Sequence, residues 1–346
     1  MDSREDAELS GGHFGRAESL VPKGQSLSGQ ISKSLRYLQG LQLPDGSIVD
    51  DPSILIFQEW DSVNALKVIA RWHKAVAFQD NGTIARLMSF LRSREKPTGM
   101  LNWGDLETGP DEYCTETSSE YIRALTLIGQ HDTAAKKAQF LQTRQLPSGP
   151  WEESHPHIPK AFQTEPSVTG FVIKALLGLD LDLTYEDEAL DFLIKAQRPE
   201  GHFGINWYYY STYYYLMRPA VAALSEFGCH SAVAQARDFT LSQQRADGSW
   251  YTYVEGFGEY SSPEQHTALA LGTLAYAGEG INHPAVRRGL TWLLDQQKPD
   301  GSWDGGSYPY PETSSYQSFR ATQHIFTTAQ VLSALHHILT LEASHG

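Results

Sequence analysis

The chain has 346 residues, of which 40% are hydrophobic and 20% charged, a composition typical of globular proteins. No run of about 18 apolar residues is present, which excludes an integral helical membrane protein and leaves at most peripheral membrane contact. The formal net charge of -14, with no cluster of Lys or Arg, argues against nucleic acid as a partner.

The N-terminal residues differ in composition from the rest of the chain. Residues 1–25 are rich in Gly, Ser and charged side chains and lack apolar periodicity, so we expect a disordered leader there. Residues 26–342 are expected to form one domain. Only two cysteines, Cys114 and Cys229, are present and no apolar signal-peptide core precedes the domain. The sequence therefore predicts a cytoplasmic protein without a disulfide framework.

One short pattern occurs six times along this domain. Five copies have an aromatic residue, Gln five positions later, Gly four positions after that and a bulky apolar residue two positions further on, and the second copy has Glu in place of the Gln. The glycines lie 47 to 53 residues apart, a spacing that fits two helices and two turns. In chain order the copies are Tyr37, Gln42, Gly46 and Ile48; the degenerate Phe90, Glu95 and Gly99; Phe140, Gln145, Gly149 and Trp151; Phe192, Gln197, Gly201 and Phe203; Phe239, Gln244, Gly248 and Trp250; and Trp292, Gln297, Gly301 and Trp303.

The pattern is typical of the end of an outer helix, because Pro stops a helix and Gly permits the turn that reverses the chain. We expect the Gln to bond backbone groups at the helix end and the Trp to stack over it. An apolar inner helix is expected after the turns, for example at residues 63–70, 122–128, 168–177, 267–274 and 328–335. Six hairpins closed into a ring predict an all-α fold, an (α/α)6 toroid with an apolar cavity at one end of the inner barrel. Only the Tyr-rich stretch at 207–215 offers a competing strand pattern.

The repeat resembles the QW motif of the terpenoid cyclase and prenyltransferase toroid superfamily, from about residue 30 to residue 340. Three further segments are similar to the domain of squalene-hopene and oxidosqualene cyclases that carries the proton donor. They are E-P-S-V-T-G at 165–170, G-I-N-W-Y-Y at 204–209 and S-P-E-Q-H-T-A-L-A-L at 262–271. The resemblance implies a monodomain class II terpene cyclase of the meroterpenoid type. Such an enzyme cyclises a linear polyprenyl or prenylated aromatic substrate by protonation, through carbocations, and needs no cofactor.

The acid motif of that family, P-D-x-D-D-T, is altered in this chain. Asp105 lies five residues before Pro110, at the spacing of the family's upstream Asp, and Pro110 with Asp111 matches the P-D pair. Aligning the helix body instead places Glu116 at the position of the middle Asp, the proton donor. The candidates for the catalytic acid are therefore Asp111, Asp105 and Glu116, each of which could equally be a helix-start residue.

A protonated carboxylic acid facing a dry pocket must donate the proton, because an alkene is a very weak base and ordinary carboxyls are ionised at pH 7. Glu59 and Glu165 begin neighbouring inner helices and could supply that environment, and Arg320 or His324 could offset the charge of the ionised acid. Carbocations call for aromatic faces that do not react with them. The candidate aromatic residues are Trp60, Trp103, Trp207, Tyr209, Tyr210, Tyr260 and Phe326.

Two other functions stay open on the sequence. The first is a protein or lipid prenyltransferase-like subunit, which would use zinc. The spacing of Asp111, Cys114, His155 and His157 lacks the paired-ligand signature, so no metal site is predicted. The second is a non-catalytic toroid that binds a lipid or polysaccharide. No oligomeric state is predicted.

Overall fold

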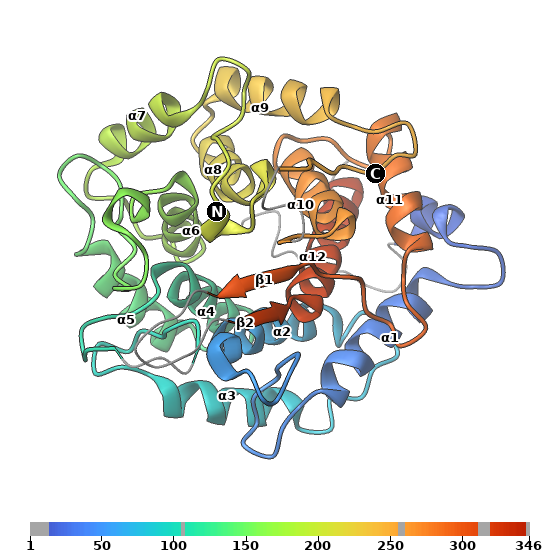
Figure 1. The fold of residues 1–346 in the computed structure, drawn as a ribbon, viewed down its shortest axis with the longest axis horizontal. Coiled ribbons are helices and arrows are strands. Elements are labelled where there is room, and N and C mark those ends of the chain that lie inside the picture. The colour runs from blue at the N-terminus through green and yellow to red at the C-terminus, as the bar shows by residue number, and fades with distance from the viewer. Residues whose placement is uncertain (1–13, 105–107, 255–259, 311–318, 344–346) are drawn as a thin grey trace.

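The computed structural model describes residues 14–104, 108–254, 260–310 and 319–343, and its helices form two concentric rings (Figure 1). The inner helices are α2 (Gln58–Trp72), α4 (Thr115–Leu127), α6 (Pro166–Leu177), α8 (Tyr213–Glu226), α10 (Pro263–Tyr276) and α12 (His324–Ala343). The outer helices are α1 (Leu27–Gly40), α3 (Thr83–Arg94), α5 (His131–Gln142), α7 (Glu186–Ala196), α9 (His230–Ser242) and α11 (Pro284–Asp295). Each inner helix packs against the next, and α12 packs against α2, which closes the barrel. The predicted (α/α)6 toroid is confirmed.

The two rings differ in how much of each helix is buried. Every residue of α2 is buried, because neighbours and an outer helix surround an inner helix on all sides. The outer helix α9 buries only Ala232, Ala236 and Thr240, which lie four residues apart along one stripe. None of the helices in the described ranges is long and apolar enough to cross a membrane.

Where the repeat carries its Gln, this residue connects an outer helix to the next one. Gln145 Nε2 donates to the carbonyl of Gly149 (2.8 Å) in the turn and to the carbonyl of Tyr185 (2.9 Å) just before α7. Trp151 is fully buried, and its Nε1 donates to the carbonyl of Leu141 (2.6 Å) near the end of α5. The predicted bonding of backbone groups by the Gln is thus confirmed, and the Trp donates to the end of the same outer helix.

The last copy of the pattern closes the outer ring. Gln297 Nε2 donates to the carbonyl of Gln30 (3.0 Å) in α1 as well as to that of Gly301 (3.3 Å). Ser34 Oγ of α1 donates to the same Gly301 carbonyl (2.7 Å). The contact between the first and last repeats therefore uses the same chemistry as the contacts inside the ring.

The degenerate second copy replaces the Gln with an ion pair. Glu95 Oε2 lies 2.8 Å from Lys137 Nζ, and Lys137 Nζ donates to the carbonyl of Gly99 (2.6 Å). Lys137 belongs to α5, the next outer helix, so the pair joins the same two segments that a Gln joins elsewhere.

A short hairpin adds a strand pair to the predicted all-α fold. Strands β1 (Ser307–Tyr310) and β2 (Phe319–Thr322) pair antiparallel, with Ser307 opposite Thr322. The hairpin lies across the centre of the ring, between the last outer turn and α12 (Figure 1). The Tyr-rich stretch, in contrast, forms the 3-10 helix η5 (Trp207–Tyr209) and the start of α8 rather than a strand.

Part of the predicted disordered leader packs on the ring. The 3-10 helix η2 (Gly15–Leu20) precedes α1, and the ring of Phe14 stacks on Trp72 with centroids 6.4 Å apart. The Glu18 carboxylate accepts from the backbone N–H of Leu27 (3.0 Å) at the start of α1. Residues 14–25 therefore differ from the expected leader, because the apolar side of a short helix is buried there.

Candidate active site

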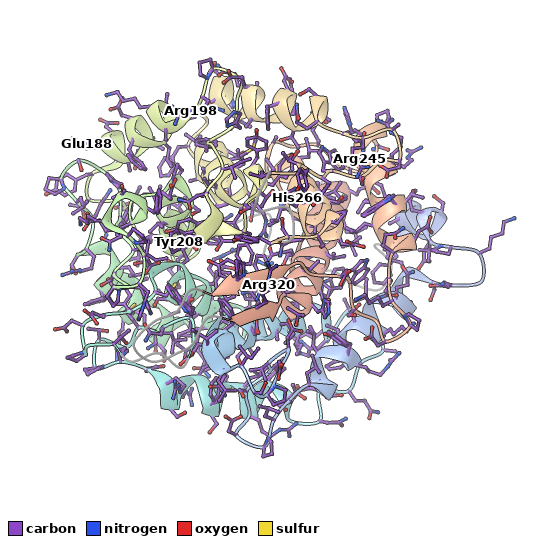
Figure 2. The ribbon with its side chains drawn as sticks, in the orientation of Figure 1. Glu188, Arg198, Tyr208, Arg245, His266 and Arg320 are labelled. Atoms are coloured by element: carbon purple, nitrogen blue, oxygen red, sulfur yellow. The ribbon has the colours of Figure 1, made fainter. Side chains whose placement is uncertain are left out.

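A cavity of about 730 Å³, its open mouth included, lies at the end of the inner barrel that carries the hairpin. Figure 2 places Tyr208 and Arg320 near the centre of the ring, whereas Glu188 and Arg245 lie on its rim. The hairpin contributes Tyr308, whose hydroxyl donates to the carbonyl of Tyr208 (3.0 Å). The lining residues are Phe57, Trp60, Trp103, Cys114, Glu116, Thr117, Glu153, His157, Ile158, Tyr208, Tyr209, Tyr210, Tyr215 and Tyr308.

Glu116 is one of two carboxyls among the described residues that line the cavity. It lies in the first turn of α4 and is 5% exposed. Ser167 Oγ donates to its Oε1 and Tyr215 Oη to its Oε2, both at 2.6 Å. Burial is the main cause that raises the pKa of Glu116 to about 8, against the lowering effect of the two hydroxyls and with a smaller raising effect of Glu153 and Glu165. Glu116 is therefore mostly protonated at neutral pH.

Glu153, which the sequence analysis did not single out, is the other carboxyl. It is 2% exposed and follows the Trp151 turn, where the chain returns toward the barrel. The backbone N–H of Thr115 donates to both of its oxygens, at 2.8 and 3.1 Å. Burial raises the pKa of Glu153 to about 7, and the N–H donors oppose this rise. The only sequence signal was a carboxyl pair, Glu152 and Glu153, just after a marker Trp.

Stacked aromatic rings form one wall of the cavity. Tyr210 stacks on Phe326 with centroids 4.6 Å apart and ring planes 8° apart, and Trp60 stacks on the same Phe326 at 5.6 Å. Trp60 Nε1 donates to Tyr210 Oη (2.8 Å), which in turn donates to Gln323 Oε1 (3.1 Å). Tyr210 has a φ of 66°, a strained conformation for a bulky residue, which these contacts hold in place.

Charged and polar residues fill the barrel beyond this wall. A much smaller cavity lies there, and Trp60 and Tyr215 line both cavities. The buried carboxylate of Glu120 pairs with Lys67 and, at 2.9 Å, with Arg123. The aromatic wall therefore separates the larger cavity from paired buried charges, which keeps those charges away from any ligand in it.

Of the other predicted aromatic residues, two line the cavity and the rest of those with described side chains do not. Trp103 lines the cavity and stacks on His155 with centroids 3.7 Å apart, and Tyr209 lines it while its hydroxyl donates to the carbonyl of Phe162 (2.9 Å). Phe326 backs the wall and lines the smaller cavity. Tyr260 is half-buried and is not among the lining residues. The side chain of Trp207 lies outside the described residues.

The other predicted polar residues lie away from the cavity. Glu59 is buried but pairs with Arg94 (2.7 Å), and Glu165 is half-buried and accepts from Asn206 Nδ2 (2.8 Å). Arg320 is exposed on β2. None of these three lines the cavity.

The two remaining acid candidates differ from Glu116 in their surroundings. Asp111 is exposed and does not line the cavity. Asp105 falls outside the described residues, so its predicted role stays a prediction. Within the described ranges, no group of three or more His, Cys, Asp or Glu residues has an arrangement that could hold a metal ion.

Comparison with known proteins places the chain in a family. Residues 163–339, slightly more than half of the chain, match the model of the squalene-hopene cyclase C-terminal domain. The chain belongs to the squalene-hopene cyclase C-terminal domain family. The resemblance predicted from the repeats is thereby confirmed. The matched segment includes Ser167, Tyr210 and Tyr215. Glu116 and Glu153 precede it.

Two curated relatives match the chain over different lengths. Drimenyl diphosphate synthase from Streptantibioticus cattleyicolor is 23% identical over 307 residues, which are 85% of this chain and 56% of the relative. Squalene-hopene cyclase from Zymomonas mobilis is 32% identical over 136 residues, 35% of this chain and 20% of the relative. The chain thus spans about half the length of the first and about a fifth of the second.

A solved structure matches this family member over nearly its full length. The type II terpene cyclase MstE from Scytonema, in complex with geranylgeranyl dihydroxybenzoate, aligns with a TM-score of 0.69 and 20% identity. The alignment covers 91% of this chain and 98% of MstE. At this identity the match shows a shared fold.

Proposed function

We propose that the chain is a class II terpene cyclase in which Glu116 protonates the terminal double bond or epoxide of a linear polyprenyl substrate. The observation that carries this proposal is a buried carboxyl, with its pKa raised to about 8, in a cavity walled by aromatic rings. A carboxylic acid that stays neutral at pH 7 can give a proton to a weak base, whereas an ordinary Glu is already ionised.

The two hydroxyls on Glu116 support this role. Ser167 comes from α6 and Tyr215 from α8, so two other inner helices fix the position of the carboxyl. After proton transfer, both hydroxyls can donate to the new carboxylate, which stabilises the charge that develops on Glu116.

The aromatic wall supports the second half of the reaction. When the alkene takes up the proton, positive charge forms on the substrate carbon, and neighbouring double bonds attack it to close the rings. The rings of Trp60 and Tyr210, which line the cavity with Phe326 stacked behind them, carry negative potential on their faces and stabilise such a cation. The hydroxyl of Tyr210 is engaged with Trp60 and Gln323, which limits its reaction with the cation.

The cavity and the relatives support a substrate class. The lining is mainly aromatic, as is usual for a site that binds an apolar small molecule. MstE was solved with a geranylgeranylated dihydroxybenzoate, and the curated relatives include a drimenyl diphosphate synthase and a squalene-hopene cyclase. We infer a polyprenyl chain, free or attached to an aromatic ring, as the substrate.

The test replaces the acid by its amide. Glu116→Gln keeps the shape of the side chain but has no acidic proton, so cyclisation should fall by at least about 10²- to 10⁴-fold while the protein stays folded. Product formation is measured from geranylgeranylated dihydroxybenzoate, farnesylated aryl substrates, geranylgeranyl diphosphate and squalene, with thermal melts as the folding control.

Three variants serve as comparisons. Glu152→Gln removes a carboxyl that is ion-paired with Lys160 (2.7 Å) outside the cavity, and it should leave turnover unchanged. Asp105→Asn and Asp111→Asn test the other acid candidates. If Glu116→Gln cyclises at the wild-type rate while either of these two variants does not, the assignment of the acid is wrong.

A further inference from the structure

Glu153 differs from Glu116 in the kind of group that bonds it. Its carboxylate accepts from the backbone N–H of Thr115 and from the backbone N–H of His155 (3.3 Å to Oε1), and more weakly from the thiol of Cys114 (3.5 Å to Oε2). An N–H group cannot accept a proton, so these bonds favour the ionised carboxylate. Glu153 also lies at the N-terminal end of α4, where the helix dipole favours a negative charge.

Glu116 has different partners. Its partners, Ser167 and Tyr215, are hydroxyls, and a hydroxyl can accept a proton as well as donate one. Glu116 can therefore remain a neutral acid while both hydroxyls keep a bond to it. The neighbours of Glu153 thus favour its carboxylate, whereas the two hydroxyls beside Glu116 can bond either of its protonation states.

Resting on the proposed function, we propose that Glu153 is the base that ends the reaction by removing a proton from the last carbocation. The Glu116 O–H bond breaks as a C–H bond forms at the end of the polyprenyl chain. At the end, a C–H bond next to the cationic carbon breaks, its electron pair forms a C=C bond, and Glu153 takes the proton. Glu153 then releases that proton to water and Glu116 takes one up, so that the net reaction is an isomerisation.

The N–H bonds on Glu153 also explain how a carboxylate can lie beside a carbocation without forming an ester with it. Both oxygens accept from Thr115 N–H, and Oε1 accepts from His155 N–H as well. These bonds spread the negative charge and weaken the attack of oxygen on carbon. Removal of a proton needs only a weak base, because a hydrogen next to a cationic carbon is strongly acidic.

The experiment compares products as well as rates, with geranylgeranylated dihydroxybenzoate and squalene as the substrates. Glu153→Gln can still accept from the Thr115 N–H but is not a base. We expect it to consume substrate while the ratio of water-captured alcohols to cyclic alkenes rises about tenfold or more, since a general base commonly contributes about 10²-fold or more. Glu116→Gln should consume almost no substrate, and Glu152→Gln should give the wild-type ratio.

Glu153→Asp is the second variant, because it keeps the carboxylate but withdraws it by one methylene. It should shift the product ratio in the same direction as Glu153→Gln, by a smaller factor. A wild-type product ratio in both Glu153 variants, even with a lowered melting temperature, would assign Glu153 a structural role only. Loss of all substrate consumption in Glu153→Gln, with activity kept in Glu116→Gln, would reverse the two roles and overturn the proposal.

The failure of this inference can be told apart from the failure of the proposed function. If the wild type forms cyclic alcohols only, no base acts and the inference fails, while the cyclase function stands. If the wild type cyclises none of the polyprenyl substrates, the proposed function fails and takes this inference with it.

Discussion

Glu116 derives its acid form from burial rather than from its position in the first turn of α4. A helix N-terminus favours an ionised carboxyl, but Glu153 accepts from the N–H of Thr115 at that end of the helix. Glu116 instead points to hydroxyls from two other helices. Glu153 therefore bonds the backbone at the helix start, whereas Glu116 bonds side-chain hydroxyls.

Turnover should depend on pH through Glu116. Its pKa is raised to about 8, so the acid is present below that value and is lost as the pH rises through it. We expect kcat to be nearly constant from pH 6 to 7 and to fall about tenfold for each unit well above pH 8. The measurement is initial rate against pH, with circular dichroism at each pH to confirm folding. A rate that stays level to pH 10 would contradict the assignment of Glu116.

The same shift should make the folded state less stable at high pH. A carboxyl whose folded pKa is raised binds its proton more tightly when folded, so its contribution is full below the unfolded pKa near 4.5 and is lost as the pH rises through about 8. Glu116→Gln does not titrate. Between pH 6 and 9, denaturant melts should show the wild type losing stability relative to Glu116→Gln by an amount on the order of a few kcal/mol. Parallel pH profiles of the two proteins would contradict this.

Sequence reasoning found some residues of the site and missed others for a geometric reason. Trp60, Tyr209 and Tyr210 were predicted to face the cavity because they lie near inner-helix starts, and all three line it. Tyr215 was not singled out, because its contact with Glu116 joins residues 99 positions apart. Glu59 also begins an inner helix, but its carboxylate turns to Arg94. Spacing along a chain predicts a helix start but not the direction of a side chain.

At the scale of elements, the turn after each outer helix should be sensitive to any side chain on its glycine. Gly149 has a φ of +102°, and a Cβ built there would lie 2.2 Å from the carbonyl carbon of Glu188. We expect Gly149→Ala to lower the free energy of unfolding by at least about 2 kcal/mol, because it adds a clash to an unfavourable φ.

Gly129→Ala is the matched control for this prediction. Gly129 also has a positive φ, +78°, but nothing lies within 4 Å of a Cβ built there, so only the conformational cost of about 1 kcal/mol applies. Chemical denaturation of the two variants measures both values. Equal losses would show that close packing of the turn on α7 contributes nothing.

The pairs of outer and inner helices were predictable because one chemical pattern is repeated in them. Gln and Gly recur at fixed spacing, and the bonds of Gln145 and Gln297 show why they must. The substitution of the Gln by Glu95 and Lys137 was not predictable, since the lysine belongs to the next helix. The β1–β2 pair was also missed, because it occurs once and has no repeat to reveal it.

At the scale of the whole molecule, we expect catalysis to need no metal. Protonation of an alkene by Glu116 requires a Brønsted acid and no Lewis acid. Turnover of dialysed enzyme should therefore be unchanged by EDTA. Loss of activity with EDTA that Zn²⁺ or Mg²⁺ restores would favour the prenyltransferase-like alternative.

The closed ring also determines when the protein can finish folding. The helix α12 packs against α2, and Gln297 bonds Gln30, so the last repeat completes the surface of the first. During synthesis on the ribosome, the apolar side of α2 has no partner on that flank until residues 324–343 have been made. Long-range contacts of this kind form late and slowly. The nascent chain must therefore keep an open, partly apolar arc in solution through most of translation, which makes it a natural client for chaperones that shield such surfaces.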